Sequence, residues 1–487
     1  MKHASFKKGK DKVAVCVTDF FRKSNVPSSI PKSTIQNSIK DLAAATQDVL
    51  DAEILWSLKL IKSHFSYKSC NNVGNLFSKM FHDSIIARQF SMSERKAAYL
   101  CHFGIAPHFQ NQVYEELRQL THFTALFDET LNKTNQQKQM DLHVRYWSKV
   151  DNRVKTRYLT STFMGHSTAT DILDAFKIAL AKLDLKKLVQ ISMDGPSVNW
   201  SFYEHFQEDL KKEHEVKCIN IGSCELHILN NAFRKGASCT EWDISSVLVA
   251  LYYLFKDSPA RREDFKEYSK SERMPMKFVN HRWLENAPVS LRAVEIWEDI
   301  KTYVKLIKNG KLPKVTCKSF KIVEEATKDA LIQVKLLFFA CVSEIIKSFL
   351  EKYQSDEPLV PFFATDIHRL AIQCLQHFKV ITDEAILKIQ SSMKFLCDFD
   401  FSDQTFHSPA SNISLGFRGD KFLNELYTKK EISDREVMDL KKESQLFITR
   451  MLHSLMAKCP INYSVVRNAK CIDPRYMSQN RNMSLKK

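Results

Sequence analysis

The chain has 487 residues, of which 44% are hydrophobic, and its 72 basic and 56 acidic side chains give a formal charge of +16. This length and apolar content exclude an intrinsically disordered protein and suffice for roughly two to four structural units. Its 10 glycines are about 2% of the residues against a usual ~7%, too few for the tight turns of a sandwich or barrel. A mostly helical α+β protein is therefore predicted, and the positive charge suits a polyanionic partner.

The cysteine pattern and the hydropathy indicate an intracellular protein. Twelve cysteines are scattered along the chain without a CxxC pair, which favours a reducing compartment. The first residues lack the apolar stretch of a signal peptide. The apolar run at 336–342 is far shorter than the ~20 residues that span a bilayer. We therefore expect neither secretion nor a membrane partner.

The first 120 residues divide into a basic tail and a helical region. Residues 1–40 carry nine Lys/Arg and two Asp, a net charge of +7, and are predicted to be poorly ordered. The apolar spacing at 41–120 predicts an N-terminal helical region. A break is expected at 104–107, before a short helix at 111–120.

The hydrophobic period changes after residue 120. Short apolar or alternating segments predict strands at 124–127, 139–147, 153–164, 188–193 and 217–221. Amphipathic segments between and after them predict helices at 170–183, 197–212 and 224–233. Three hairpin-connected strands followed by βα units are the arrangement of the ribonuclease H-like fold, so such a core is predicted at 121–240.

The rest of the chain is predicted to be an all-helical insertion at 241–465 followed by a basic C-terminal tail at 466–487. Helical periodicity is clearest at 245–255, 289–307, 329–350, 365–378 and 433–456. Ser433, three residues before Glu436, predicts a capping box at the start of the last helix. Residues 465–487 hold six Lys/Arg and one Asp, a net charge of +5. The two tails either contact DNA phosphates or serve only solubility or nuclear import.

Two of the predicted strands, 124–127 and 188–193, end near an aspartate followed by turn residues. In the predicted fold these strands are neighbours, so Asp128 and Asp194 would meet at one end of the sheet. Two or three carboxylates there can hold Mg²⁺ or Mn²⁺ ions about 4 Å apart against a phosphodiester. The alternative is that both aspartates are ordinary turn residues. Glu129 would point to the opposite face if its strand continues.

A thiol and an imidazole follow at helical spacing. Cys224 and His227 lie three residues apart at the start of a predicted helix, on one face of it. They form either half of a zinc site or a packed cysteine beside a hydrogen-bonded histidine.

Two basic pairs are candidates for nucleic-acid contact. Arg261 and Arg262 follow Pro259 at a predicted helix start, where they either contact a phosphate or lie on an exposed helix face. Arg282 and Trp283 either contact nucleic acid or form a buried tryptophan beside a salt-bridged arginine.

The order of these motifs resembles the hAT superfamily of cut-and-paste DNA transposases, in particular the transposon-derived branch that often carries an N-terminal BED zinc finger. The resemblance runs from about residue 50 to the C-terminus and is clearest over 121–290. It implies a ribonuclease H-like catalytic domain interrupted by a large helical insertion. By that match Asp128 and Asp194 are the first two acids of the metal-binding triad. Cys224 and His227 are the CxxH motif, and Arg282-Trp283 is the RW motif.

The sequence departs from this family in two places. The family's third acid is a glutamate on a helix beyond the insertion, whereas the last glutamate here is Glu443, on what reads as an exposed face of a charged helix. After it comes only Asp473, in a segment that reads as a turn. The N-terminal zinc finger is also missing, since Cys16 has no CxxC partner.

Three functions follow as hypotheses. The first is a catalytically incomplete, domesticated transposase-derived protein that binds DNA or protein partners in the nucleus, alone or as a homo-oligomer, with no small-molecule substrate. The second is an active metal-dependent transposase or nuclease that uses Asp128 and Asp194 with Mg²⁺ or Mn²⁺, and Glu129 or Asp473 as the third acid. The third is a helical scaffold for protein interactions.

Overall fold

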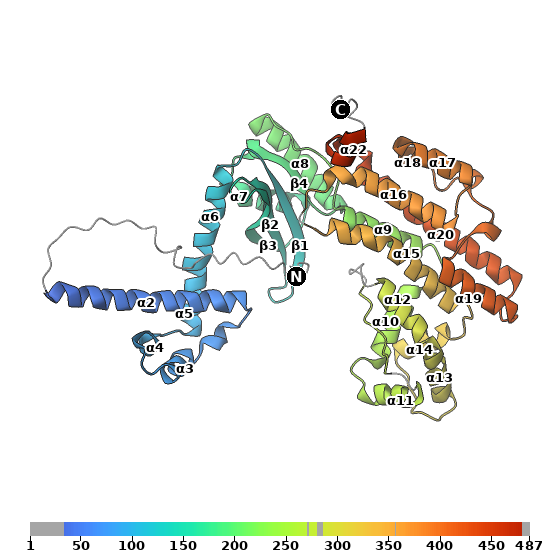
Figure 1. Cartoon of the computed structure of the whole chain (residues 1–487), viewed down its shortest axis with the longest axis horizontal. Helices are drawn as coiled ribbons and strands as arrows, with labels where there is room; N and C mark the ends of the chain where they lie inside the picture. Colours follow the sequence, from blue (N-terminus) through green and yellow to red (C-terminus); the bar gives the residue numbers. More distant parts are fainter. Residues whose placement is uncertain (1–33, 270–271, 280–285, 356, 480–487) are drawn as a thin grey trace. The chain divides into compact units, whose positions relative to one another are not determined.

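The computed structural model describes residues 34–269, 272–279, 286–355 and 357–479, and Figure 1 shows the chain with its helices and strands labelled. The chain forms two compact units, one up to Gln112 and one from Val113. Most described residues are helical, and the strands form one four-stranded mixed sheet, which confirms the predicted α+β class. Among the described helices, none combines the length and apolarity needed to cross a membrane.

The first unit is helical, as predicted. Its elements are α2 (Thr34–Lys62), the 3₁₀ turn η1 (Tyr67–Cys70), α3 (Val73–Met80), α4 (Ile85–Gln89) and α5 (Glu94–Tyr99). Their small core consists of Leu60, Cys70, Val73, Phe90, Met92 and Ala97. Beside it, the buried Glu53 carboxylate pairs with the Lys96 ammonium at 2.5 Å and accepts the Ser91 N–H.

The predicted break at 104–107 is wrong. A π-helical turn (Leu100–Ile105) runs directly into α6 (Ala106–Arg118), without an interruption. Pro107 is tolerated because it lies in the first turn of α6, next to a π turn that already replaces the regular i→i−4 hydrogen bonds. The division between the two units falls within this helix.

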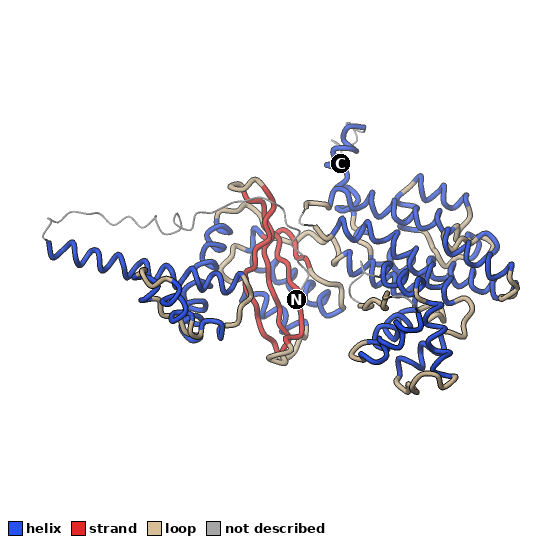
Figure 2. Tube along the Cα trace, turned by 60° about the horizontal axis from the view of Figure 1, so that its bottom comes forward, coloured by secondary structure: helices blue, strands red, loops and turns tan. Residues whose placement is uncertain are grey.

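The sheet of the second unit consists of β1 (Phe123–Asn132), β2 (Gln137–Ser148), β3 (Arg153–Met164) and β4 (Leu188–Ser192), in the order β3-β2-β1-β4. The first three strands pair antiparallel, and β4 is parallel to β1. The predicted neighbourhood of the first and fourth strands is therefore confirmed. Figure 2 shows these four strands as one twisted ribbon of red segments beside the helices.

One face of the sheet is apolar. Between β3 and β4 runs α7 (Ala169–Leu180), and α8 (Ser197–His214) follows β4. Phe127 of β1 meets Phe176 of α7 at 5.8 Å and Phe202 of α8 at 5.3 Å between ring centroids, both edge to face. This cluster packs against one face of β1. The side chains of β1 that alternate with Phe127 therefore project from the opposite face.

The predicted fifth strand at 217–221 is wrong, since this segment is irregular. One backbone bond joins it to the sheet, from the Ile219 N–H to the Val189 carbonyl at 2.7 Å. The Gln207 side chain amide bonds both backbone groups of Cys218, at 2.9 Å and 2.8 Å. A side chain thus satisfies the polar groups that a strand ladder would use.

The predicted helical region after residue 240 is present. Its helices include α10 (Ile244–Phe255), α11 (Pro259–Ser269) and α15 (Ile332–Tyr353). The others are α12 (Asn286–Glu295), α13 (Trp297–Lys308), α14 (Lys318–Ala326), α16 (Val360–Phe378), α17 (Asp383–Ser391), α18 (Met393–Asp398), α19 (Phe417–Thr428), α20 (Asp434–Lys458), α21 (Ser464–Asn468) and α22 (Pro474–Gln479). Within the described part of this region, the β pairing is a single isolated bridge between Ile381 and His407.

One detail of this region differs from the sequence prediction, and the turn and the capping box are consistent with it. The helix expected at 289–307 is two helices, because the chain leaves helical geometry at Ile296. The segment around Asp473, expected to be a turn, lies between the 3₁₀ turn Ala469–Ile472 and α22. The capping box of Ser433 and Glu436 is formed as predicted.

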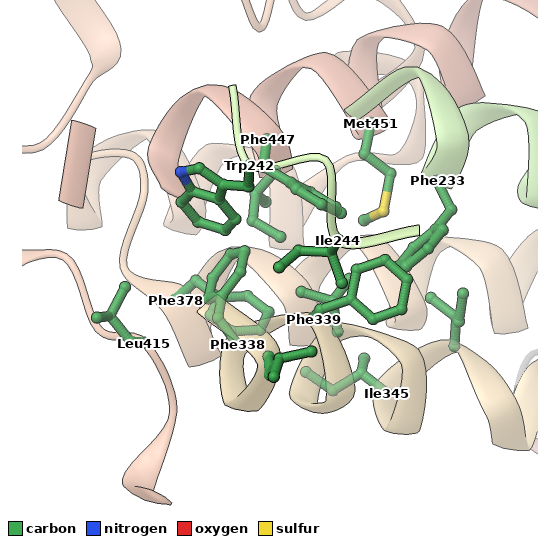
Figure 3. Packing of buried hydrophobic residues seen from close by; sticks show 14 of the residues in the cluster. Phe233, Trp242, Ile244, Phe338, Phe339, Ile345, Phe378, Leu415, Phe447 and Met451 are labelled. Atoms are coloured by element: carbon green, nitrogen blue, oxygen red, sulfur yellow. The ribbon is translucent and has the colours of Figure 1, made fainter. Parts of the chain in front are cut away.

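The link between the sheet and the helical region is α9 (Glu225–Ala237), which packs along α20. Figure 3 shows Phe233 of α9 in the apolar cluster, where its ring contacts Phe339 of α15 and Phe447 of α20. Gly236 allows this close approach, because a Cβ there would lie 2.6 Å from the Phe447 carbonyl oxygen. The position of α9, and so of the residues at its N-terminus, is fixed by a well-packed core.

Candidate functional site

The site lies on the face of the sheet opposite the apolar cluster, and its first member is Asp128. The prediction that a strand ends at this residue is wrong, because β1 continues to Asn132 and the turn comes after it. The Asn132 side chain accepts the N–H groups of Thr134 and Asn135 and so forms that turn. Asp128 is therefore a mid-strand residue whose side chain alternates with the buried Phe127.

The strand that continues past Asp128 brings in a residue that the sequence analysis missed. Asp128 is the direct cross-strand partner of Asp141 on β2. Residues directly opposite in an antiparallel pair have Cβ atoms about 5 Å apart, so both carboxylates share one face. Glu129 pairs with the buried Met140 and lies on the other face, as expected for a strand that continues.

Asp194 follows β4 and is held in place by its backbone neighbours. The Cys224 N–H donates to the carbonyl of Met193 at 3.0 Å, which joins the end of β4 to the start of α9. Gly195 comes so close to Ser223 that a Cβ would lie 2.6 Å from the Ser223 Oγ. These contacts bring the end of the fourth strand and the first turn of α9 together.

The CxxH motif meets Asp194 at this junction. Cys224 is the N-cap residue of α9, and His227 lies within the first turn. The His227 Nδ1 stands 2.9 Å from the Asp194 Oδ1. One ligand-type atom each of Asp194, Cys224 and His227 can be chosen so that all three lie within 4.8 Å of one another. The hydrogen-bonded histidine is thus present, and its partner is one of the two predicted acids.

The electrostatics of the site follow from this crowding of charges. Hydrogen bonds with Asp194 and then Cys224 stabilise the imidazolium and raise the pKa of His227 to about 10. Although the Asp128 side chain is exposed, partial desolvation by the surrounding groups raises its pKa, and repulsion from Asp194 adds to the shift, while the His227 charge opposes it. Asp141 contributes a smaller repulsion in the same direction. A cation placed among these groups would relieve that repulsion.

The neighbours of Asp141 extend the polar face across β2 and β3. The Asp141 Oδ1 accepts hydrogen bonds from the Ser161 hydroxyl at 2.5 Å and from the Gln139 amide at 2.7 Å. His143, two residues along β2, lies on the same face. Burial lowers the pKa of His143, against the attraction of Asp141 and Asp128.

The sequence held a signal that would have found Asp141 and His143. A turn at 133–136 pairs residue 132 with 137, and the same register places Asp141 opposite Asp128. Alternation along Met-Asp-Leu-His-Val then puts Asp141 and His143 together on the polar face. The predicted strand stopped at Phe127, so this register was not available.

Of the two pairs predicted to contact nucleic acid, the structure describes one. Arg261 and Arg262 lie at the start of α11, which begins at Pro259 as predicted. Arg261 does not form an exposed pair with its neighbour, because its guanidinium donates to the Leu254 carbonyl at 3.0 Å and to the Cys317 sulfur at 3.7 Å. Arg262 is exposed. Arg282 and Trp283 lie outside the described residues, as does Cys16.

The carboxylates of Glu443 and Asp473, the two acids late in the chain, pair with other side chains. Glu443 is not on a free charged face, since its carboxylate accepts the Trp242 indole N–H at 2.5 Å, in the helical core. Asp473 is buried and pairs with the Arg475 guanidinium at 2.9 Å. That pairing lowers the pKa of Asp473. Neither Glu443 nor Asp473 is among the charged groups that shift the pKa of Asp128 in the described chain.

Comparisons with known proteins leave the family of this chain open. Its function is therefore inferred from the residues of the site and their geometry. No protein-family model matches the chain, and no curated protein matches its sequence.

Proposed function

We propose that the chain is a transposase-derived nuclear protein of the hAT type that binds DNA through a ribonuclease H-like core and is catalytically incomplete. The carrying observation is that Asp128 of β1 lies close enough to Asp194, which follows the neighbouring parallel strand β4, for the two carboxylates to repel each other, with His227 of the CxxH motif bonded to Asp194. The strand order β3-β2-β1-β4 and the long helical region after the site agree with the same proposal.

The donor set fits a divalent cation in part. Asp128, Asp141 and Asp194 offer the carboxylate oxygens that Mg²⁺ and Mn²⁺ prefer. Bound there, such an ion would polarise a phosphoryl oxygen as a Lewis acid. Two of the three carboxylates already have partners, however, since Asp194 bonds His227 and Asp141 bonds Ser161 and Gln139. The family's late glutamate has no counterpart at this site among the described residues, because Glu443 bonds Trp242.

The DNA-binding part of this proposal is supported by charge. The chain carries +16 in total, and its two ends carry +7 and +5 over residues 1–40 and 465–487. Lysine and arginine side chains that neutralise phosphates release condensed counterions, so binding weakens with salt.

We expect the purified chain to bind duplex DNA with a strongly salt-dependent affinity. For roughly five phosphate contacts the logarithm of the association constant should fall against the logarithm of salt concentration with a slope of about −4.5. Fluorescence anisotropy of a labelled duplex, measured at several salt concentrations, gives this slope. Absence of salt-dependent binding to any duplex would refute the DNA-binding proposal.

The second candidate, an active metal-dependent nuclease, is favoured by one observation: Asp141 faces Asp128 and could serve as a third carboxylate. We nevertheless expect no cleavage of DNA by the chain in Mg²⁺ or Mn²⁺, because two of the acids are engaged by side chains. The measurement is conversion of supercoiled plasmid to nicked or linear forms.

Cleavage that is lost in Asp194→Ala would overturn the proposed inactivity, and Asp141→Asn would then test the third acid. Cleavage that is unchanged in both Asp128→Ala and Asp194→Ala would come from a contaminating nuclease and would leave the chain itself inactive, as proposed.

A further inference from the structure

We propose that Asp194, Cys224 and His227 form a binding site for a thiophilic transition-metal ion such as Zn²⁺. The three residues supply a carboxylate oxygen, a sulfur and an imidazole nitrogen, which are the three ligand types that zinc takes in proteins. The sequence showed only Cys224 and His227, which looked like half of a site without a partner. The missing third ligand comes from the end of β4, 30 positions before Cys224 in the chain.

The distances suit a tetrahedral ion. With zinc–ligand bonds of about 2.0–2.3 Å, the ligand atoms of such a site stand about 3.3–3.6 Å apart. Here the three ligand atoms lie within 4.8 Å of one another, and the His227 Nδ1 is separated from the Asp194 Oδ1 by 2.9 Å. Changes of less than about 1.5 Å, within the reach of side-chain rotation, would therefore bring them to tetrahedral spacing.

The backbone around the ligands is already organised. The Cys224 N–H bond to Met193 and the close approach of Gly195 to Ser223 fix the end of β4 against the first turn of α9. Cys224 and His227 share one side of that turn because they are three residues apart. Binding would then require side-chain adjustment without folding of a loop, which reduces its entropic cost.

The site has room for a fourth ligand. The side chains of His227 and Asp194 are 48% and 34% exposed. Three protein ligands with an open position for water are typical of catalytic zinc sites, whereas structural sites are closed by four protein ligands.

The ligand types also distinguish the proposed zinc site from a magnesium site. Magnesium prefers oxygen ligands alone, so it would be held by Asp128, Asp141 and Asp194. Zinc would be held by Asp194 together with Cys224 and His227. Since Asp194 belongs to both sets, zinc at this site would compete with magnesium for that carboxylate.

Cobalt(II) titration of the full-length, metal-free chain tests the proposal, because Co²⁺ occupies zinc sites and is coloured. We expect saturable binding of one ion that produces both a thiolate-to-cobalt charge-transfer band and the visible bands of a four-coordinate ion. Added Zn²⁺ should displace the cobalt and abolish both features, since zinc binds such sites more tightly.

Variants identify the ligands. Cys224→Ser should abolish the charge-transfer band. His227→Gln and Asp194→Asn should each weaken cobalt binding by at least about tenfold, since loss of even outer-shell partners costs 10–100-fold in metal affinity. Cys239→Ser is the matched control, because Cys239 is a partly exposed free cysteine just past the C-terminal end of α9, and its replacement should leave the spectrum unchanged.

Circular dichroism of each variant shows whether it is folded. The proposal is overturned if folded Cys224→Ser keeps the charge-transfer band, which would assign the binding to other thiols, or if the parent chain shows no such band. DNA binding is measured separately without transition metals, so failure of the metal site and failure of the proposed function are distinguishable.

Discussion

Replacing Phe127 with alanine is expected to lower the free energy of unfolding of the second unit by about 4 kcal/mol. The Phe127 side chain is 5% exposed and packs edge to face against Phe176 and Phe202. Truncation removes these contacts and leaves a cavity beneath β1, which the surrounding helices can close only in part. Guanidinium chloride unfolding, followed by far-ultraviolet circular dichroism, measures the change.

The control for this prediction is Phe163→Ala on β3 of the same sheet. The Phe163 side chain is 46% exposed, so its truncation should cost less than about 1 kcal/mol. Equal losses in the two variants would show that the apolar cluster does not support β1. Hydrogen exchange adds a local readout, since amides of β1 should lose protection in Phe127→Ala.

The strand β1, which Phe127 supports and which carries Asp128, belongs to the part of the site that the sequence could predict. A short apolar run bounded by turn residues is a local property, and two such runs correctly predicted the strand that carries Asp128 and the strand that precedes Asp194. Their adjacency followed from the order of the elements, because three hairpin strands and a crossover helix leave the fourth strand beside the first.

The parts that could not be predicted depend on tertiary contacts. The segment at 217–221 has the composition of a strand, but Gln207 of α8 takes the backbone groups of Cys218. The bond between His227 and Asp194 depends on how Gly195 meets Ser223, which no periodicity reports. Glu443 looked like an exposed charge, and only the packing of α20 shows that it bonds Trp242, 201 positions away.

Asp141 is a different case, because a local signal for it existed. The hairpin register that follows from a turn at 133–136 is fixed by chain geometry alone. A first strand that stops at Phe127 excludes this register, so the sequence prediction gives the site fewer carboxylates than the structure shows.

A second large effect is expected from Gly236→Ala, at the contact between α9 and α20. In an isolated helix this change would be stabilising by up to about 1 kcal/mol, since alanine has the higher helix propensity. Here the new Cβ would stand 2.6 Å from the Phe447 carbonyl oxygen and 3.0 Å from the Met451 Cβ. One of these neighbours is backbone, so the two helices have to separate, and we expect a net loss of about 2 kcal/mol in the free energy of unfolding.

Gly165→Ala is the matched control for Gly236→Ala, because a Cβ at Gly165 would have no atom within 4 Å. Its effect should stay within about 0.5 kcal/mol of zero or be slightly stabilising, through the lower entropy of the unfolded chain. Denaturant unfolding of both variants separates the two mechanisms. If Gly236→Ala were as stable as the parent chain, α9 would not be held against α20 at this point. The first turn of α9, with Cys224 and His227, would then lack the rigid support that positions it beside Asp194.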